Sequence, residues 1–183
     1  MSSSELSLFD FEVLALVGNG GAGPHDLLQM ARRGRIFALA GESQYYTAPK
    51  RLAKLGYLSC RKEPGRTRER SVYRLTDEGR EALASWAREP VHFPRVRHEA
   101  LVRLLAADLV GEAVVVASIG TLRADIAEAL EAIESAEQSA RALPHRATYL
   151  LLGHSLARRL AATTLEWIDD VERELSGPAA EVP

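Results

Sequence analysis

The sequence has a single cysteine, Cys60, among its 183 residues. One thiol cannot form a disulfide within the chain, and a lone thiol is typical of proteins in a reducing compartment. Long apolar runs are also absent, and Met1–Glu5 lack the basic and then apolar pattern of a secretory signal. We therefore expect a cytoplasmic protein that does not cross a membrane, with Cys60 as a small buried side chain.

The chain also lacks the side-chain patterns of catalytic and metal sites. Its five histidines show no metal-ligand spacing, and none has a carboxylate four residues further on. The segment 153–157 lacks the second glycine of a nucleophile elbow and falls in a predicted helix. We therefore expect no enzyme activity, no metal and no cofactor.

Residues 18–23, Gly-Asn-Gly-Gly-Ala-Gly, match the letters of the dinucleotide-binding fingerprint. That fingerprint binds pyrophosphate only between a strand and a helix, in a sheet built of βαβ units. Here the chain continues with one hairpin and long helices, which favours a plain loop between two helices. A nucleotide-dependent enzyme is the alternative that this interpretation rejects.

Charge is unevenly distributed along the chain. The net charge of −2 would argue against a nucleic-acid partner if it were spread evenly. Residues 43–74, however, carry nine Lys and Arg against two Glu, a net charge of +7, whereas residues 91–183 have nine Arg against 14 acids. A basic region on a mildly acidic body is typical of a protein that contacts phosphates with one surface.

Two short helices are predicted at the start of the chain. Ser7 with Asp10 resembles a capping box, and apolar residues at helical spacing then indicate a helix over residues 7–17. Pro24 suits the first position of a second helix, and Gly34 can end it in a left-handed conformation.

A third helix is predicted over residues 43–56, with Leu52 and Leu55 facing inward and basic residues facing outward. Neighbouring positions on a helix point about a third of a turn apart. We therefore expect one of the adjacent Tyr45 and Tyr46 to pack inside and the other, Tyr46, to reach outward.

The pattern then changes to a β-hairpin. Residues 57–63 and 71–75 predict two strands, joined by a Pro64-Gly65 turn. Thr76, followed by two acids, is a strong start for a fourth helix that carries Trp86. Three helices and a basic hairpin predict a winged helix-turn-helix, whose third helix enters the major groove of DNA while the wing contacts the flanking backbone.

The remainder of the chain predicts helices over about 97–109, 112–142 and 146–175. Each of the two longer helices has an apolar stripe at spacings of three and four residues. The first stripe contains Ile119, Leu122, Ile126, Ala129, Ile133, Ala136 and Ala140, and the second contains Tyr149, Gly153, Leu156, Leu160, Thr164, Ile168, Val171 and Leu175.

A hairpin of two such helices is too thin to bury both stripes by itself, so a second copy of the chain is the expected cover. The predicted fold class is mainly α, with an N-terminal winged helix-turn-helix and a C-terminal long-helix dimerisation arm. We place the DNA-binding domain at residues 1–90 and the dimerisation domain at residues 91–183.

Three segments resemble the PadR family of winged-helix regulators. Val13-Leu-Ala-Leu16 is followed by a Gly-Pro-His loop at residues 23–25, and residues 46–58 are similar to the family's Tyr-x-x-Leu-x-x-Leu-x-x-x-Gly-Leu run. The most specific segment is Val72-Tyr-Arg-Leu-Thr-Asp-Glu-Gly-Arg-Glu-Ala-Leu83, which resembles the family's strand-to-helix junction. The acidic tail resembles the family's C-terminal dimerisation region in length and pattern.

The resemblance implies a homodimeric repressor that binds an inverted-repeat operator, and release of the operator by a small aromatic or drug-like effector. It implies that Tyr46, Lys50 and Arg51 face DNA from the third helix, and that Arg66, Arg68 and Arg70 do so from the wing. With two more polar side chains of the same helix and hairpin, the candidate DNA contacts are Gln44, Tyr46, Lys50, Arg51, Lys62, Arg66, Arg68 and Arg70.

The third helix departs from the family at Pro49, where the family has an apolar leucine. Proline lacks the amide that an internal helical hydrogen bond needs. Either the helix begins near Thr47, with Pro49 in its first turn, or the helix is kinked. The same residue motivates an alternative function, a winged-helix protein-interaction module that does not bind DNA.

Two tryptophans, Trp86 and Trp167, are candidates for an effector site. Flat aromatic ligands stack well on indole rings, although aromatic residues at helical spacing more often fill a core.

Overall fold

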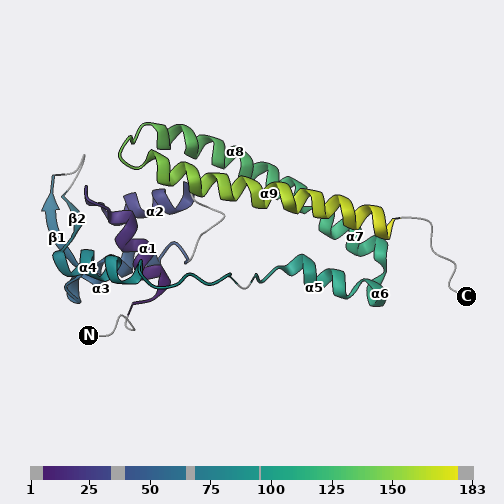
Figure 1. Ribbon diagram of the computed structural model, residues 1–183, viewed down its shortest axis with the longest axis horizontal. Helices are drawn as coiled ribbons and strands as arrows, with labels where there is room; N and C mark the ends of the chain where they lie inside the picture. The colour runs from purple at the N-terminus through teal and green to yellow at the C-terminus, as the bar shows by residue number, and fades with distance from the viewer. Residues whose placement is uncertain (1–5, 34–39, 65–68, 95, 177–183) are drawn as a thin grey trace, which may run out of the picture. The chain divides into compact units, whose positions relative to one another are not determined.

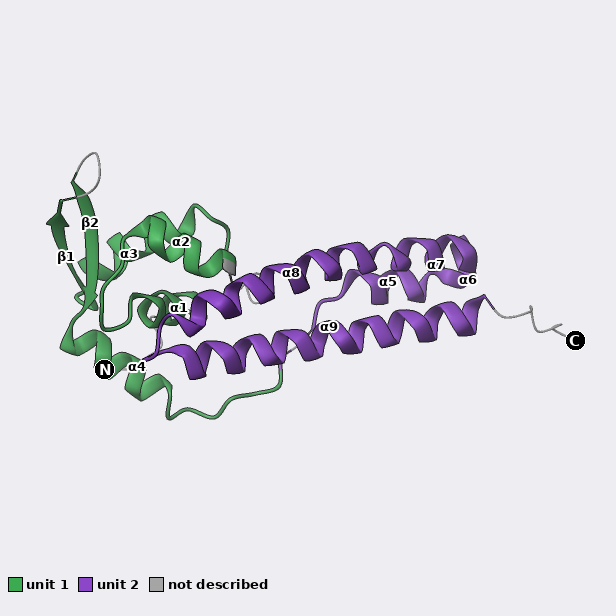
Figure 2. Cartoon of the chain, turned by 90° about the horizontal axis from the view of Figure 1, so that it is seen from above, with its two compact units in different colours: residues 1–93 green, residues 94–183 purple. Residues whose placement is uncertain are grey.

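The computed structural model describes residues 6–33, 40–64, 69–94 and 96–176. The chain divides into two compact units, residues 1–93 and 94–183 (Figure 2). Both are mostly helical, and the sheet among the described residues is one two-stranded hairpin in the first unit (Figure 1). The predicted fold class, a mainly α protein with a winged helix followed by long C-terminal helices, is confirmed.

Side chains determine where the first helix begins. α1 (Leu8–Val17) follows Ser7, whose Oγ accepts a hydrogen bond from the Asp10 amide at 3.3 Å. The Asp10 carboxylate in turn accepts from the Ser7 amide at 2.9 Å. This is the reciprocal capping box that the sequence predicts, and it satisfies two amides at the helix start. α2 (Pro24–Arg33) follows after a short loop.

That loop, residues 18–23, joins two helices, as predicted, and so lacks the strand that a dinucleotide fingerprint requires. Ala22 pairs with Tyr73 of β2 (Arg70–Leu75) through backbone hydrogen bonds of 3.0 and 2.9 Å. Gly21 has a φ of +80°, and a Cβ there would lie 2.9 Å from the Tyr73 carbonyl oxygen. The glycine therefore allows the loop to lie against the hairpin.

α3 (Gln44–Lys54) buries one flank and exposes the other. Tyr45 and Leu52 are 2% and 0% exposed, whereas Tyr46 is 41% exposed, so the predicted division between the two tyrosines is confirmed. Leu55 was expected to face inward but is 46% exposed. The helix ends at Lys54, and Leu55 lies in the turn that follows, beyond the packed flank.

The hairpin pairs β1 (Leu58–Glu63) with β2 in antiparallel register, Leu58 opposite Leu75 and Cys60 opposite Tyr73. The predicted hairpin is confirmed. The expectation that Cys60 is buried is wrong, because its side chain is exposed. Only Leu58, at the base of β1, packs into the helical core, and the strand beyond it projects away from that core.

One hydrophobic core joins α1, α2, α3 and the base of the hairpin. It contains mainly aliphatic and aromatic side chains that alternate with exposed polar residues at helical spacing. Its larger members are Phe11, Val13, Leu14, Val17, Leu27, Leu28, Tyr45, Leu52, Leu58 and Tyr73.

α4 (Asp77–Trp86) begins at Thr76, as the sequence predicts. The Thr76 hydroxyl accepts from the Gly79 amide at 3.0 Å and donates to the Gly56 carbonyl at 2.7 Å. Gly79 lies directly against the backbone of the preceding turn, where a Cβ would be 2.2 Å from the Tyr57 carbonyl oxygen. The start of α4 is therefore held at the point where α3 leads into β1.

The second unit has five helices among its described residues. The predicted helix over 97–109 is divided at Ala106, and the one over 112–142 is divided at Thr121, next to Gly120. The helices are α5 (Glu99–Leu105), α6 (Ala107–Val110), α7 (Glu112–Gly120), α8 (Leu122–Arg141) and α9 (Ala147–Leu175). None of the described helices is both long and apolar enough to cross a membrane.

α8 and α9 pack side by side as an antiparallel hairpin (Figures 1 and 2). All seven residues of the first predicted stripe are buried or half-buried, so this stripe is confirmed. The second stripe is only partly correct. Ala157 and Ala161 are the buried residues in the middle of α9, because small side chains let the two helices approach closely. The predicted residues that are instead exposed are Tyr149, Gly153, Leu156 and Leu160.

The close approach at Gly79 leads to a stability prediction. Gly79→Ala should lower the free energy of unfolding by about 1–3 kcal/mol, because the added methyl group overlaps the Tyr57 carbonyl. Helix propensity alone predicts the opposite sign, a gain of up to about 1 kcal/mol. Urea unfolding followed by circular dichroism measures the change. Glu81→Ala, at an exposed position of the same helix, is the control and should change stability by less than about 0.5 kcal/mol.

Candidate nucleic-acid interface

Four side chains form the outer face of α3: Tyr46, Thr47, Lys50 and Lys54. All four are exposed and lie opposite the buried flank of the helix. No carboxylate in the described part of the chain lies within ion-pair distance of Lys50 or Lys54. Thr47 and Lys54 are not among the contacts expected from the sequence. The spacing of four residues between Tyr46, Lys50 and Lys54 is the signal that would have identified Lys54.

Pro49 lies inside α3, five residues after its start at Gln44. The alternative in which the helix begins near Thr47 is therefore wrong. Pro49 cannot donate a hydrogen bond to the carbonyl of Tyr45, four residues earlier. Its ring is fully buried on the flank that packs in the core, so Pro49 is not part of the outer face.

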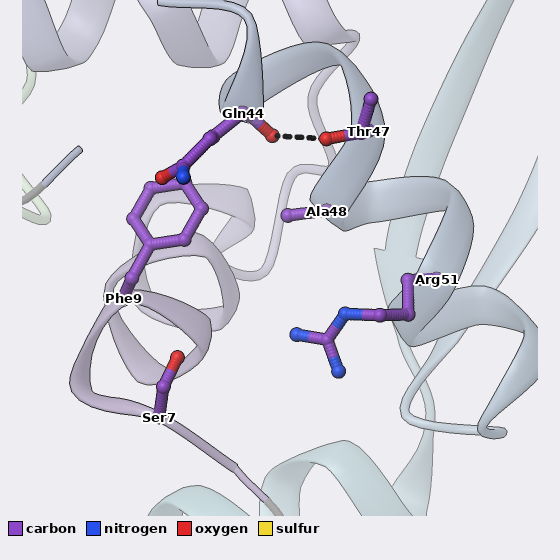
Figure 3. A pocket seen from close by; sticks show the side chains of 6 residues that line it. All are labelled: Ser7, Phe9, Gln44, Thr47, Ala48 and Arg51. Carbon is purple, nitrogen blue, oxygen red and sulfur yellow. Dashed lines mark hydrogen bonds between the residues drawn. The ribbon is translucent and has the colours of Figure 1, made fainter. Parts of the chain in front are cut away.

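Gln44 and Arg51 lie at the edge of α3 rather than on its outer face. They line a groove between α3 and the start of α1, together with Ser7, Phe9, Thr47 and Ala48 (Figure 3). The side chain of Arg51 extends across this groove toward Ser7 (Figure 3). There its guanidinium donates to the carboxylate of Asp10.

Asp10 is the charged side chain of this contact that is removed from water. It is 2% exposed, whereas the Arg51 side chain is 48% exposed. Burial by itself raises the pKa of the Asp10 carboxyl, but hydrogen bonds from Ser7 and Arg51 together outweigh burial and hold the pKa below its ordinary value. Asp10 is therefore ionised at neutral pH and attracts Arg51 across the groove.

A second polar contact joins α1 to α3. The Tyr45 hydroxyl donates to Glu12 Oε1 at 3.1 Å. Burial, and then the nearby Glu12 carboxylate, raises the pKa of Tyr45 to about 12. Burial also raises the pKa of Glu12, although the bond from Tyr45 opposes that change. Tyr45 thus serves as an anchor of α3 and keeps its proton at neutral pH.

The hairpin carries exposed cations of two kinds. Lys62 is exposed and no described acid pairs with it, whereas Arg70 donates to Asp26 at 3.2 Å and Arg74 donates to Glu63 at 2.9 Å. Exposed ion pairs contribute little to stability, so phosphates can replace these acids at low cost. Arg66 and Arg68, the two arginines expected at the wing tip, lie outside the described residues.

The two candidate effector residues belong to different units. Trp86 stacks on Phe11, with ring centroids 4.7 Å apart and planes at 8°. Trp167 packs against the core of the second unit and meets the ring of His98 edge-on at 5.9 Å. Both rings therefore have packing roles. Among the described residues, no group of three or more His, Cys, Asp or Glu side chains could hold a metal ion.

The fold is shared with solved structures of bacterial regulators. Bacillus subtilis PadR in complex with operator DNA superposes with a TM-score of 0.79 at 17% identity, covering 92% of this chain and 99% of that one. The Vibrio cholerae virulence activator AphA superposes with a TM-score of 0.72 at 20% identity, covering 91% of this chain and 97% of that one. B. subtilis PadR in complex with p-coumaric acid superposes with a TM-score of 0.68 at 18% identity, covering 93% of this chain and 96% of that one. At these identities the likeness establishes the fold.

Two family models match the chain itself, although no curated protein does. Residues 96–176 match the family described as virulence activator alpha C-term, which spans the helices of the second unit. Residues 27–85 match the family described as transcriptional regulator PadR-like, a family of regulators rather than enzymes. This second match includes α3, the hairpin and most of α4. Over residues 27–85 the chain therefore belongs to the PadR-like family of transcriptional regulators.

Proposed function

We propose that this regulator is a homodimeric repressor that binds an inverted-repeat operator through α3 and the hairpin. The observation that carries the proposal is the outer face of α3, where Lys50 and Lys54 are exposed without an acidic partner among the described residues. An α-helix fits the major groove of B-DNA, and unpaired cations on its exposed side are free to neutralise phosphates. The solved structure of B. subtilis PadR in complex with operator DNA, which shares this fold, supports an operator as the ligand.

The proposed contacts have different roles. Tyr46 and Thr47 contact base edges or the sugar-phosphate backbone from the outer face, and Lys50 and Lys54 contact phosphates. Gln44 and Arg51 act at the edge of α3. The wing contributes Lys62, Arg66, Arg68 and Arg70, which contact the flanking backbone.

The proposed dimer forms through the dimerisation domain, residues 91–183, which includes the whole second unit, and leaves residues 1–90 for DNA. Two sets of large apolar side chains in this unit are exposed. On α5 and α6, Leu105 and Leu109 are 82% and 80% exposed, and on α9 Tyr149, Leu152 and Leu156 continue the pattern. Large apolar side chains exposed in such numbers support a protein interface in this domain. A twofold dimer would present two copies of α3 to half-sites about 34 Å apart, or a multiple of that distance.

The alternative without DNA binding, a protein-interaction module, is motivated by Pro49. Because Pro49 is buried on the opposite flank, it does not disturb the exposed cations, and this weakens the alternative. A regulator that responds to a small aromatic effector is the second part of the proposal. It is supported by the structure of B. subtilis PadR with p-coumaric acid and by the half-buried indole of Trp167 beside His98.

The first prediction concerns the outer face of α3. Fluorescence anisotropy with duplexes from upstream of the protein's own coding sequence should show one that binds more tightly than its scrambled version. Binding should weaken as salt rises, because phosphate contacts release counterions. Replacing both Lys50 and Lys54 by Ala should reduce the slope of log K against log salt by about 0.9 for each phosphate that the variant no longer neutralises.

Arg159→Ala is the matched control, since it removes one exposed cation from α9 in the second unit. It should leave the slope unchanged. A lysine variant with an unaltered slope would exclude the outer face of α3 from the DNA contact. Absence of DNA binding at low salt by the unmodified protein would favour the interaction module.

The second prediction concerns the dimer. Leu105→Glu combined with Leu109→Glu should raise the dimer dissociation constant at least about 100-fold, because each carboxylate would be buried without a partner. Sedimentation equilibrium measures the change. Gln138→Glu adds a negative charge at an exposed position of α8 and should leave the dimer intact. A double variant that dissociates no more readily than this control would show that α5 and α6 lie outside the interface.

The third prediction concerns the effector. p-Coumaric acid should quench the tryptophan fluorescence of the protein and release it from its operator duplex. Trp167→Phe should abolish most of the quenching, whereas Trp86→Phe should retain it, since Trp86 is already stacked on Phe11. Quenching that survives in Trp167→Phe and disappears in Trp86→Phe would place the ligand in the first unit instead.

A further inference from the structure

The ion pair between Asp10 and Arg51 joins the start of α1 to the edge of α3. We infer that Asp10 determines the sequence specificity of DNA binding by holding the Arg51 guanidinium in one position and by reducing its attraction to phosphates at other positions. The inference rests on the proposed function, because it assigns to Asp10 a role in that same binding surface. Asp10 is in this sense a positioning residue, which acts on DNA through Arg51.

Asp10 is itself held from three directions. Its Oδ2 accepts from the Ser7 amide at 2.9 Å and from the Ser7 hydroxyl at 2.8 Å, and its Oδ1 accepts from Arg51. The side chain is almost entirely buried, so it cannot turn toward solvent. Because the Asp10 carboxylate is fixed, the Arg51 guanidinium that binds it is held in one position.

Arg51 retains donors for a second partner. A guanidinium has five N–H groups in a rigid plane, and Arg51 donates to Asp10 through Nη2. About half of the side chain is exposed, at the mouth of the groove that Gln44 and Thr47 also line (Figure 3). A long side chain that is already ordered loses less conformational entropy when it binds, which favours a partner placed at that point.

The same pair weakens binding at other positions. An arginine beside a buried carboxylate attracts a phosphate less strongly than a free arginine does, because the two charges offset each other. Pairing with Asp10 therefore weakens binding to random DNA more than binding to a DNA site whose bases fit the fixed position of the Arg51 guanidinium. The ion pair between Arg70 and Asp26 differs from the pair between Arg51 and Asp10, because the carboxylate of Asp26 is exposed. Arg70 Nη1 lies 3.2 Å from Asp26 Oδ2, and both side chains are open to solvent, so phosphates can displace Asp26 freely.

The test is Asp10→Asn in the full-length protein, measured by anisotropy on the preferred upstream duplex and on its scrambled version. Asparagine retains an oxygen that can accept from Ser7, so the helix cap is kept while the charge is removed. The ratio of the two affinities should fall roughly fivefold or more, the value of one well-placed base contact. The scrambled duplex should bind more tightly, with a salt slope steeper by up to about 0.9.

Two controls separate this role from a general effect. Glu81→Gln removes one exposed negative charge from α4 and should leave the affinity ratio within about twofold. In an Arg51→Gln background, Asp10→Asn should cause no further loss of the ratio, because the two residues act as a unit. Thermal melting of each variant confirms that the fold is retained at the assay temperature.

An unchanged ratio in Asp10→Asn, or an equal loss in the Arg51→Gln background, would overturn the inference while leaving DNA binding intact. A wild-type protein that prefers none of the upstream duplexes over its scrambled version would instead contradict the proposed function, and the inference with it. The two failures are therefore distinguishable in one set of measurements.

Discussion

The burial of one flank of α3 against α1 is the constraint on which the first unit depends. Tyr45 and Leu52 can leave water only if this flank faces the core, and the opposite side of the helix must then face outward. The same packing accommodates Pro49, whose missing amide weakens the helix but whose ring fills space in the core. The direction of the lysines is thus a consequence of apolar packing on the other side of the helix.

Two acids on α1 add polar contacts to this packing. Asp10 pairs with Arg51, and Glu12 accepts from the Tyr45 hydroxyl, so both carboxylates bind side chains of α3. Burial raises the pKa of both carboxyls. For Asp10 the hydrogen bonds from Ser7 and Arg51 outweigh burial and lower its pKa, whereas for Glu12 burial outweighs the single bond from Tyr45 and its pKa is raised. Together with the apolar contacts, these bonds determine the rotation of α3 relative to α1.

The basic region contains two functional classes of cation, which its net charge does not distinguish. Arg51, Arg70 and Arg74 pair with acids of the same unit, whereas the lysines at positions 50, 54 and 62 have no described partner. Arg51 has a defined position beside a buried carboxylate and a reduced attraction for phosphate, whereas phosphates can displace the exposed acids that pair with Arg70 and Arg74. The charges of the lysines are not neutralised by a described acid. Under the proposed function, the lysines attract DNA and Arg51 discriminates between sequences.

Local patterns in the sequence predicted the helix caps at Ser7 and Thr76, the hairpin, the inner position of Tyr45 and the uneven charge. These features depend on residues close together in the chain, so spacing and residue type are sufficient to predict them. Tertiary structure decided what spacing cannot predict: that Cys60 and Leu55 are exposed, and that α9 packs through Ala157 and Ala161. It also decided that Arg51, at the edge of α3, pairs with Asp10. Each of these depends on which distant segment lies against a residue, and side chains 41 positions apart, such as Asp10 and Arg51, meet only when the core brings their helices together.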